Sequence, residues 1–300
     1  MICIDEKFRA EYRTYRYLSD LMDDELLNRG RDTFRNFMTI NSAGKVSTLP
    51  SAHQFHMYWR MRFMHFLEEC VLRFGPYPNG LSSEFTNKLK IPNPNSKKVQ
   101  LAISAVDRSI LEDGKYLVKY GKHEHLKQML LSGIVKISPA STYADASLNE
   151  ATRDTELEFT FRLYRPTHED LKPYLNQNST TFPLDGTAII TQTAREDFHL
   201  FCLSASYSPH LFDDFNAEAC LLITKPIEFR DRLLSVVHDE INARGHTFSA
   251  VTYTDPLTES GTGIHITLRK NARYAYQDEM RAVWLPKNRS ASLKEQFVSL

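Results

Sequence analysis

The most informative stretch of the sequence is YAYQDEMRAVW, residues 274–284. Its β-forming residues predict a strand, which we expect to cover 274–285. Side chains alternate between the two faces of a strand, so Gln277, Glu279 and Arg281 should share one face. Such a row of amide, carboxylate and guanidinium groups either lines a ligand cleft or forms a solvated strand face with a Glu–Arg ion pair. The pattern alone leaves both interpretations open.

Upstream of this stretch, strand-like segments alternate irregularly with a few helices. Strands are expected at 115–120, 134–138, 156–164, 187–193, 198–205, 219–224 and 251–253. Helices are expected at 124–132, which Gly133 should end, and at 226–243. Many strands without strict strand–helix repetition predict an α+β fold with a mixed β-sheet rather than a doubly wound one.

The N-terminal part of the chain has a helical pattern instead. Phe8, Tyr12, Tyr15 and Leu18 recur at spacings of three and four, and a second amphipathic helix should end at Phe74. Residues 76–98 are rich in Pro, Asn, Gly and Ser, which favours a loop or linker, and a helix is expected at 99–111. We therefore predict a helical N-terminal domain with its linker at 1–98 and an α+β domain at 99–300.

Composition limits the possible environments and partners of the chain. Its 300 residues include 37 Lys and Arg and 37 Asp and Glu, so the balanced charge gives no general attraction to nucleic acid or acidic lipid. We find no long apolar segment of the kind that signal peptides or membrane helices need. The four cysteines, Cys3, Cys70, Cys202 and Cys220, are scattered, which is typical of reduced, buried thiols. We therefore expect a cytoplasmic protein without membrane contact.

Two further segments carry polar side chains that could face a ligand. Ser204 and Ser206 lie two apart at the end of an expected strand, where both hydroxyls could point at a ligand or bond to nearby backbone groups. Lys119 and Tyr120 end another strand. A lysine there could hold a phosphate and a tyrosine could stack on a planar ring, but an edge strand with a solvated lysine explains them equally.

Several well-known motifs are absent from the sequence. It has no GxGxxG, no GxxxxGK[ST], no GxSxG and no HExxH, so it shows no sign of a dinucleotide fold, a P-loop, a hydrolase elbow or a zincin site. No metal-ligand pattern occurs among the histidines and cysteines. Asp197, Asp213 and Asp214 could serve a metal-dependent nuclease, but no second carboxylate motif supports that alternative.

The order of these segments resembles a widespread, poorly characterised bacterial family. Its members have a Y-[KR]-Y strand, an I-x-F-S-x-P-x-x-F-N-D-P segment, a C-F-S strand and a closing Y-x-x-E-x-E-[WY]-R. The corresponding segments here are Lys119-Tyr120, Ile137-Ser138-Pro139, Cys202-Leu203-Ser204 and 276–281, although 142–146 read TYADA where the family has Phe-Asn-Asp-Pro. The resemblance covers about residues 112–286. That family is in turn similar to the ADP-ribosyltransferase superfold.

The resemblance implies a site and a substrate. In the superfold, a late [QE]-x-E motif supplies the catalytic carboxylate, which implies Glu279 for that role and Gln277 for orienting the acceptor. It further implies that NAD is the substrate and that a second group of residues binds it: Lys119, Tyr120, Ser138, Tyr143, Ser204, Ser206 and Arg281. Lys or Tyr stands where the superfold has Arg or His on the first strand.

Three functions follow from these observations as hypotheses. The first is NAD-dependent ADP-ribosyl transfer or NAD cleavage in bacterial cytoplasm, as a toxin or antiviral defence effector that modifies a protein or nucleic acid. The second is a non-catalytic sensor or adaptor on the same superfold, which binds a partner protein through the N-terminal helical domain. The third is the metal-dependent nuclease. Fold analogy alone does not decide among them.

Overall fold

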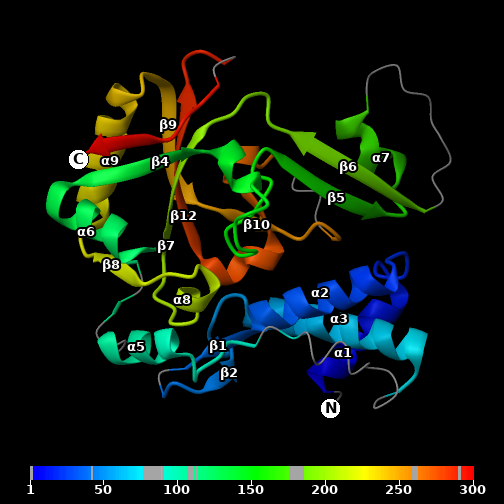
Figure 1. The fold of residues 1–300 in the computed structure, drawn as a ribbon. Coiled ribbons are helices and arrows are strands. Elements are labelled where there is room, and N and C mark those ends of the chain that lie inside the picture. Colours follow the sequence, from blue (N-terminus) through cyan, green and yellow to red (C-terminus); the bar gives the residue numbers. More distant parts are fainter. Residues whose placement is uncertain are drawn as a thin grey trace.

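The computed structural model describes residues 3–41, 43–76, 89, 91–106, 111–112, 114–175, 186–258, 263–289 and 292–300. The chain is a mixed α+β protein, which confirms the predicted class at that level. A seven-stranded antiparallel sheet lies beside a layer of N-terminal helices (Figure 1). No helix among the described residues is both long and apolar enough to cross a membrane.

Three helices form the N-terminal layer, and they pack around one apolar cluster. They are α1 (Ile4–Thr14), α2 (Asp23–Phe37) and α3 (His56–Phe74). Tyr12, Leu18, Leu26 and Phe66 are buried between them. The predicted helical stripe is wrong in part, because Tyr15 is 52% exposed and Leu18 lies beyond the end of α1 at Thr14. A short hairpin that the sequence analysis missed, β1 (Met38–Ile40) with β2 (Val46–Thr48), separates α2 from α3.

The central sheet runs in the order β13-β4-β7-β12-β9, with β3 pairing both β7 and β8. Its strands are β3 (Leu117–Gly121), β4 (Ile134–Pro139), β7 (His199–Ser204), β8 (Ala219–Ile223), β9 (Ala243–Ala250), β12 (Glu279–Pro286) and β13 (Gln296–Ser299). Helix α9 (Pro226–Glu240) covers one face and buries Leu233 and Val237 against Phe201 and Trp284. Helix α6 (His123–Ser132) connects β3 to β4 and ends at Gly133, whose φ of +67° favours glycine. Strands β9 and β13 were not predicted.

Pairing between β7 and β12 sets the geometry at the centre of the sheet. Glu279 stands opposite Ser204, and Arg281 stands opposite Cys202. Val118 of β3 also pairs with Ser204. Residues distant in sequence therefore meet where β7 ends and β12 begins.

The predicted strand at 274–285 begins five residues too early. Residues Ala272–Gln277 form the 3₁₀ helix η5, in which the Asn271 side chain accepts a hydrogen bond from the Arg273 amide at 3.0 Å. Asp278 then takes a left-handed conformation with φ of +46°, and β12 starts at Glu279. Gln277 is therefore not on the strand face that carries Glu279 and Arg281. The side-chain cap at Asn271 favours a 3₁₀ helix here, although the tyrosines have a high β propensity.

Smaller elements surround the sheet. They are α5 (Lys97–Ala105), η2 (Ala140–Ala144), β5 (Glu158–Tyr164), α7 (His168–Leu171), η3 (Lys172–Tyr174), β6 (Thr187–Thr193), α8 (Leu211–Asp214), β10 (Thr252–Thr254), η4 (Ile266–Leu268) and β11 (Arg269–Asn271). Strands β5 and β6 form a hairpin apart from the central sheet, and β10 pairs with β11 in parallel. The predicted helix at 99–111 is α5, which starts earlier and ends at Ala105.

Buried charges connect the N-terminal helices to the sheet region. Asp255, directly after β10, is 0% exposed. Its Oδ2 lies 2.5 Å from Arg29 Nη2 of α2 and 3.2 Å from Arg62 Nε of α3. The boundary near residue 98 stays a prediction, and most of the expected linker, 77–88 and 90, lies outside the described residues. The structure does show that the two predicted units share a buried ion cluster.

Candidate functional site

A recess of about 210 Å³ lies where β3, the end of β7 and the start of β12 meet η5. Most of the residues proposed from the sequence line it: Lys119, Tyr120, Tyr143, Ser204, Gln277 and Glu279. The β7–β12 register supplies Ser204 and Glu279, and η5 places Gln277 beside them. Residues from five separate segments therefore converge on one recess.

Glu279 is buried in the recess and is held by two cations. Its Oε2 lies 2.7 Å from Lys270 Nζ, and its Oε1 lies 2.8 Å from Arg281 Nε. Burial alone would raise the pKa of this carboxyl, but Arg281 and Lys270 outweigh burial and hold the pKa well below its usual value. Glu279 is therefore ionised throughout the physiological pH range.

Arg281 extends this ion pair into a four-residue cluster. Its side chain is 0% exposed, and its Nη1 and Nη2 bind the two oxygens of Glu156 at 2.8 and 3.0 Å. The buried charge cluster of Glu156, Lys270, Glu279 and Arg281 thus has two acids and two bases. The expected Glu–Arg pair exists, but the solvated strand face considered as an alternative is wrong because both residues are buried. Arg281 does not line the recess and acts on it through Glu279.

Sequence reasoning missed Lys270 and Glu156. Lys270 Nζ also donates to Gln277 Oε1 at 3.2 Å, so it links the two residues proposed for catalysis. Both residues reach the cluster through tertiary packing of β11 and of the segment before β5, and no spacing in the sequence indicates that approach. Burial lowers the pKa of the Lys270 ammonium, but Glu279 and Glu156 outweigh it and raise the pKa well above its ordinary value.

The two serines differ in their surroundings. Ser204 Oγ donates to the backbone oxygens of Gln277 at 2.8 Å and Ser206 at 2.9 Å, so it fastens η5 to the end of β7. Strand β7 ends at Ser204, so Ser206 does not lie on a strand face with Ser204, and the expectation that both hydroxyls share one face is wrong. Ser206 lines neither the recess nor the adjoining groove.

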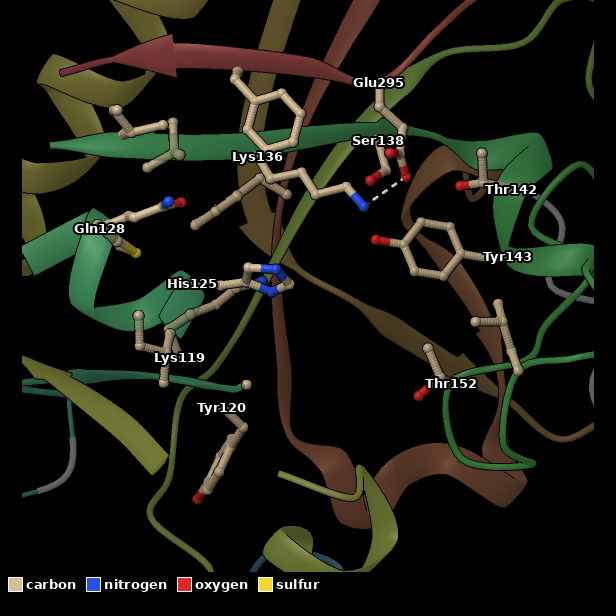
Figure 2. A pocket seen from close by; sticks show the side chains of 18 of the residues that line it. Lys119, Tyr120, His125, Gln128, Lys136, Ser138, Thr142, Tyr143, Thr152 and Glu295 are labelled. Atoms are coloured by element: carbon tan, nitrogen blue, oxygen red, sulfur yellow. Dashed lines mark ion pairs between the residues drawn. The ribbon is translucent and has the colours of Figure 1, made fainter. Parts of the chain in front are cut away.

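A larger groove of about 790 Å³ adjoins the recess and lies between β3, α6, β4 and η2 (Figure 2). Lys119, Tyr120, Tyr143 and Thr152 line both spaces, so the recess and the groove lie side by side. Ser138 lines the groove only. At the rim, Lys136 Nζ forms an ion pair with Glu295 Oε1 at 2.7 Å.

Lys119 stands between the groove and the recess. Its Nζ donates to the Cys202 carbonyl oxygen at 2.8 Å and lies 4.3 Å from the centre of the Phe201 ring. Within the part of the chain that the structure describes, no carboxylate forms an ion pair with it. Burial lowers the pKa of the ammonium. An anionic group of a ligand would supply the counter-charge that Lys119 lacks and would favour its charged form.

The two tyrosines of the site present different groups. The Tyr120 hydroxyl donates to the Ser208 carbonyl oxygen at 3.3 Å and accepts from the Ser208 amide at 2.8 Å. Its hydroxyl is therefore engaged, and its ring contributes to the lining of the site. The Tyr143 hydroxyl is directed into the groove (Figure 2) and bonds to no other described residue. Burial raises the pKa of Tyr143 well above its usual value, so the hydroxyl stays protonated and can donate.

The carboxylates of the nuclease alternative have separate partners. Asp197 accepts from Ser141, Asp213 accepts from Ser96, and Asp214 pairs with Arg35. Over the described ranges, no group of three or more His, Cys, Asp and Glu side chains is arranged to hold a metal ion. Cys202 lines the recess, and burial raises the pKa of its thiol to about 12, which favours the protonated, unreactive form. The expectation of buried thiols is wrong for Cys3, which is exposed.

Comparisons of the chain with protein-family models, curated proteins and solved structures found no match.

Proposed function

We propose that the groove and recess bind NAD and that the protein breaks the nicotinamide–ribose bond, either with water or with a group on a protein or nucleic-acid acceptor. The observation that supports this proposal best is the convergence of Gln277, Glu279 and Ser204 in one recess. The resemblance to the ADP-ribosyltransferase superfold assigns roles to those positions.

The dimensions of the site suit a ligand with a ring at one end. A volume of about 790 Å³ for the groove is within the roughly 300–1,000 Å³ typical of small-molecule sites. The recess, at about 210 Å³, has room for the nicotinamide end alone. Tyr120 and Tyr143 would pack against that ring, and Lys119 at the junction would face the pyrophosphate.

The chemistry needs an ionised carboxylate beside the ribose. As the bond between the ribose C1′ and the nicotinamide nitrogen breaks, positive charge develops on the sugar, and nicotinamide leaves as a neutral molecule. The electron pair of an attacking water or acceptor forms the new bond to C1′, and its proton passes to solvent. Glu279 would stabilise the developing charge from a water-poor recess, where such interactions are strong. Its low pKa keeps it charged for this role.

The second candidate is a non-catalytic sensor that binds NAD or a related nucleotide. The engagement of both Glu279 oxygens, by Lys270 and Arg281, favours it. These cations offset the negative charge that an oxocarbenium-like ribose would need. A partner protein bound through α1, α2 and α3 would then respond to whether the nucleotide is bound.

Binding and turnover separate these candidates. The purified protein should bind NAD in calorimetry and should release nicotinamide from labelled NAD, with or without added cell lysate. NAD binding with neither nicotinamide release nor ADP-ribose transfer, in both conditions, would support the sensor. The absence of both NAD binding and nicotinamide release would contradict both candidates.

A further inference from the structure

A second cavity, of about 190 Å³, adjoins the recess and lies between residues 154–160, which include the start of β5, and residues 266–273. Glu156 and Lys270 line both this cavity and the recess and form the wall between them. Its other basic residues are Arg269 and Arg273. Strand β11 and the start of η5 thus direct three cationic residues to one small space.

Arg269 is the unusual member of this set. The residue is 3% exposed, yet its Nε and Nη2 make no hydrogen bond. Its Nη1 donates to Gln192 Oε1 at 2.5 Å, and its guanidinium lies 4.9 Å from the centre of the Phe159 ring. Within the described ranges, no carboxylate forms an ion pair with it. A buried charge without a counter-ion costs several kcal/mol, so proteins normally pair it.

Arg273 adds a third unsatisfied nitrogen. Its Nη2 donates to the Tyr274 hydroxyl, but its buried Nε has no hydrogen-bond partner. The acids that line the cavity are engaged or exposed. Glu156 binds Arg281 and Lys270, Asp154 accepts from the Thr155 amide at 2.9 Å, and Glu158 faces solvent. Two nitrogens of Arg269 and one of Arg273 are therefore left for a ligand.

We propose that this cavity is an oxyanion site in which Arg269 and Arg273 bind a phosphate group, free or carried on a small phosphomonoester. Guanidinium groups match the oxygens of a phosphate in pairs and give charge-assisted hydrogen bonds. The volume accommodates one such group with little else. The unpaired donors of two guanidinium groups suit the several oxygens of a phosphate better than the two oxygens of a carboxylate. This proposal is independent of NAD chemistry in the recess.

Equilibrium dialysis of the full chain against radiolabelled inorganic phosphate, at constant ionic strength, tests the site directly. We expect one saturable site per chain. Glycerol phosphate should compete if the phosphate can be carried on a small molecule, and acetate should not compete. Absence of a saturable site in the wild type, or equal competition by acetate, would overturn the proposal.

Variants locate the site. Arg269→Met should weaken phosphate binding about tenfold or more, because it removes charged donors. Arg232→Met is the matched control, since Arg232 is exposed on α9 and lines none of these cavities, and it should bind as the wild type does.

Thermal unfolding gives a second measurement that does not depend on the label. Phosphate should raise the unfolding temperature of the wild type and of Arg232→Met, but not of Arg269→Met. Without phosphate, Arg269→Met should be at least as stable as the wild type, because it removes an unpaired buried charge. If Arg269→Met retained the phosphate-dependent shift, the site would lie elsewhere. If that variant failed to fold, Arg273→Gln would take its place in both measurements.

Discussion

Lys270 Nζ lies 2.7 Å from Glu279 Oε2 at the back of the recess, and this contact joins β11 to the first residue of β12. Because Arg281 holds the other oxygen of Glu279, the carboxylate has a fixed orientation before any ligand arrives. Fixed charges act on a reacting group without the cost of reorganising. The same contact also offsets the negative charge of Glu279. The catalytic account needs that charge beside the ribose, whereas the sensor account does not.

Asp255 should be the most important link between the N-terminal helices and the sheet. Asp255→Asn leaves Arg29 and Arg62 without their buried counter-ion, and it should lower the free energy of unfolding by about 3–5 kcal/mol. Asp5→Asn removes a half-exposed pair with Arg60 and should cost at most about 1 kcal/mol. Urea unfolding measures the change in the free energy of unfolding for both variants. Equal costs would show that the buried cluster does not hold the two parts together.

Asp154 should make stability depend on pH. Burial and the neighbouring Glu156 raise its pKa to about 6, although Lys270, Arg273 and Arg281 act against them. The folded state therefore holds a proton that the unfolded state loses near pH 4, and stability falls as the pH rises from about 4 to 6.

Asp154→Asn removes this penalty. The variant should be more stable than the wild type by about 1–3 kcal/mol at pH 7.5, and the difference should vanish near pH 4. Asp145→Asn is the control, since the contacts with Ser147 lower the pKa of Asp145, and the variant should lose stability at neutral pH. Urea unfolding at both pH values checks this, and a pH-independent gain for Asp154→Asn would contradict it.

Tyr143 should affect the ligand and not the fold. Its hydroxyl bonds to no other described residue, so Tyr143→Phe should change stability by less than about 0.5 kcal/mol. If the hydroxyl binds NAD, the variant should bind NAD about five- to tenfold more weakly. Tyr120→Phe loses the bonds to Ser208 and should reduce stability instead. Calorimetry and thermal unfolding compare the two variants, and unchanged NAD affinity in Tyr143→Phe would exclude its hydroxyl from the site.

Local patterns predicted the elements with strong periodicity. The apolar spacing located α3 and α9, and Gly133 marked the end of α6, because those signals act over a few residues. Strands β9 and β13 were missed since their residues alternate weakly. The start of β12 was misplaced because a side-chain cap at Asn271 and a left-handed Asp278 end the preceding segment as a 3₁₀ helix.

The candidate site was predictable only in part. Gln277 and Glu279 do share a recess, but the predicted reason, a common strand face, is wrong for Gln277. Lys270 and Glu156 could not be found, because they approach Glu279 and Arg281 from strands and loops that only the tertiary fold brings near. Pairwise contacts of that kind leave no trace in one sequence.

Nicotinamide release from labelled NAD by the wild type, Glu279→Gln and Asp278→Asn tests the proposed function most directly. Glu279→Gln keeps the size of the side chain but loses the charge, and it should reduce the rate about 100- to 1,000-fold. Asp278 has a left-handed conformation that asparagine also accepts, so Asp278→Asn should keep most of the activity. Circular dichroism must show that Glu279→Gln is folded, because it disturbs the pairs with Lys270 and Arg281. We predict release by the wild type and Asp278→Asn and almost none by folded Glu279→Gln; full activity in folded Glu279→Gln, or no release by the wild type, would contradict the proposal.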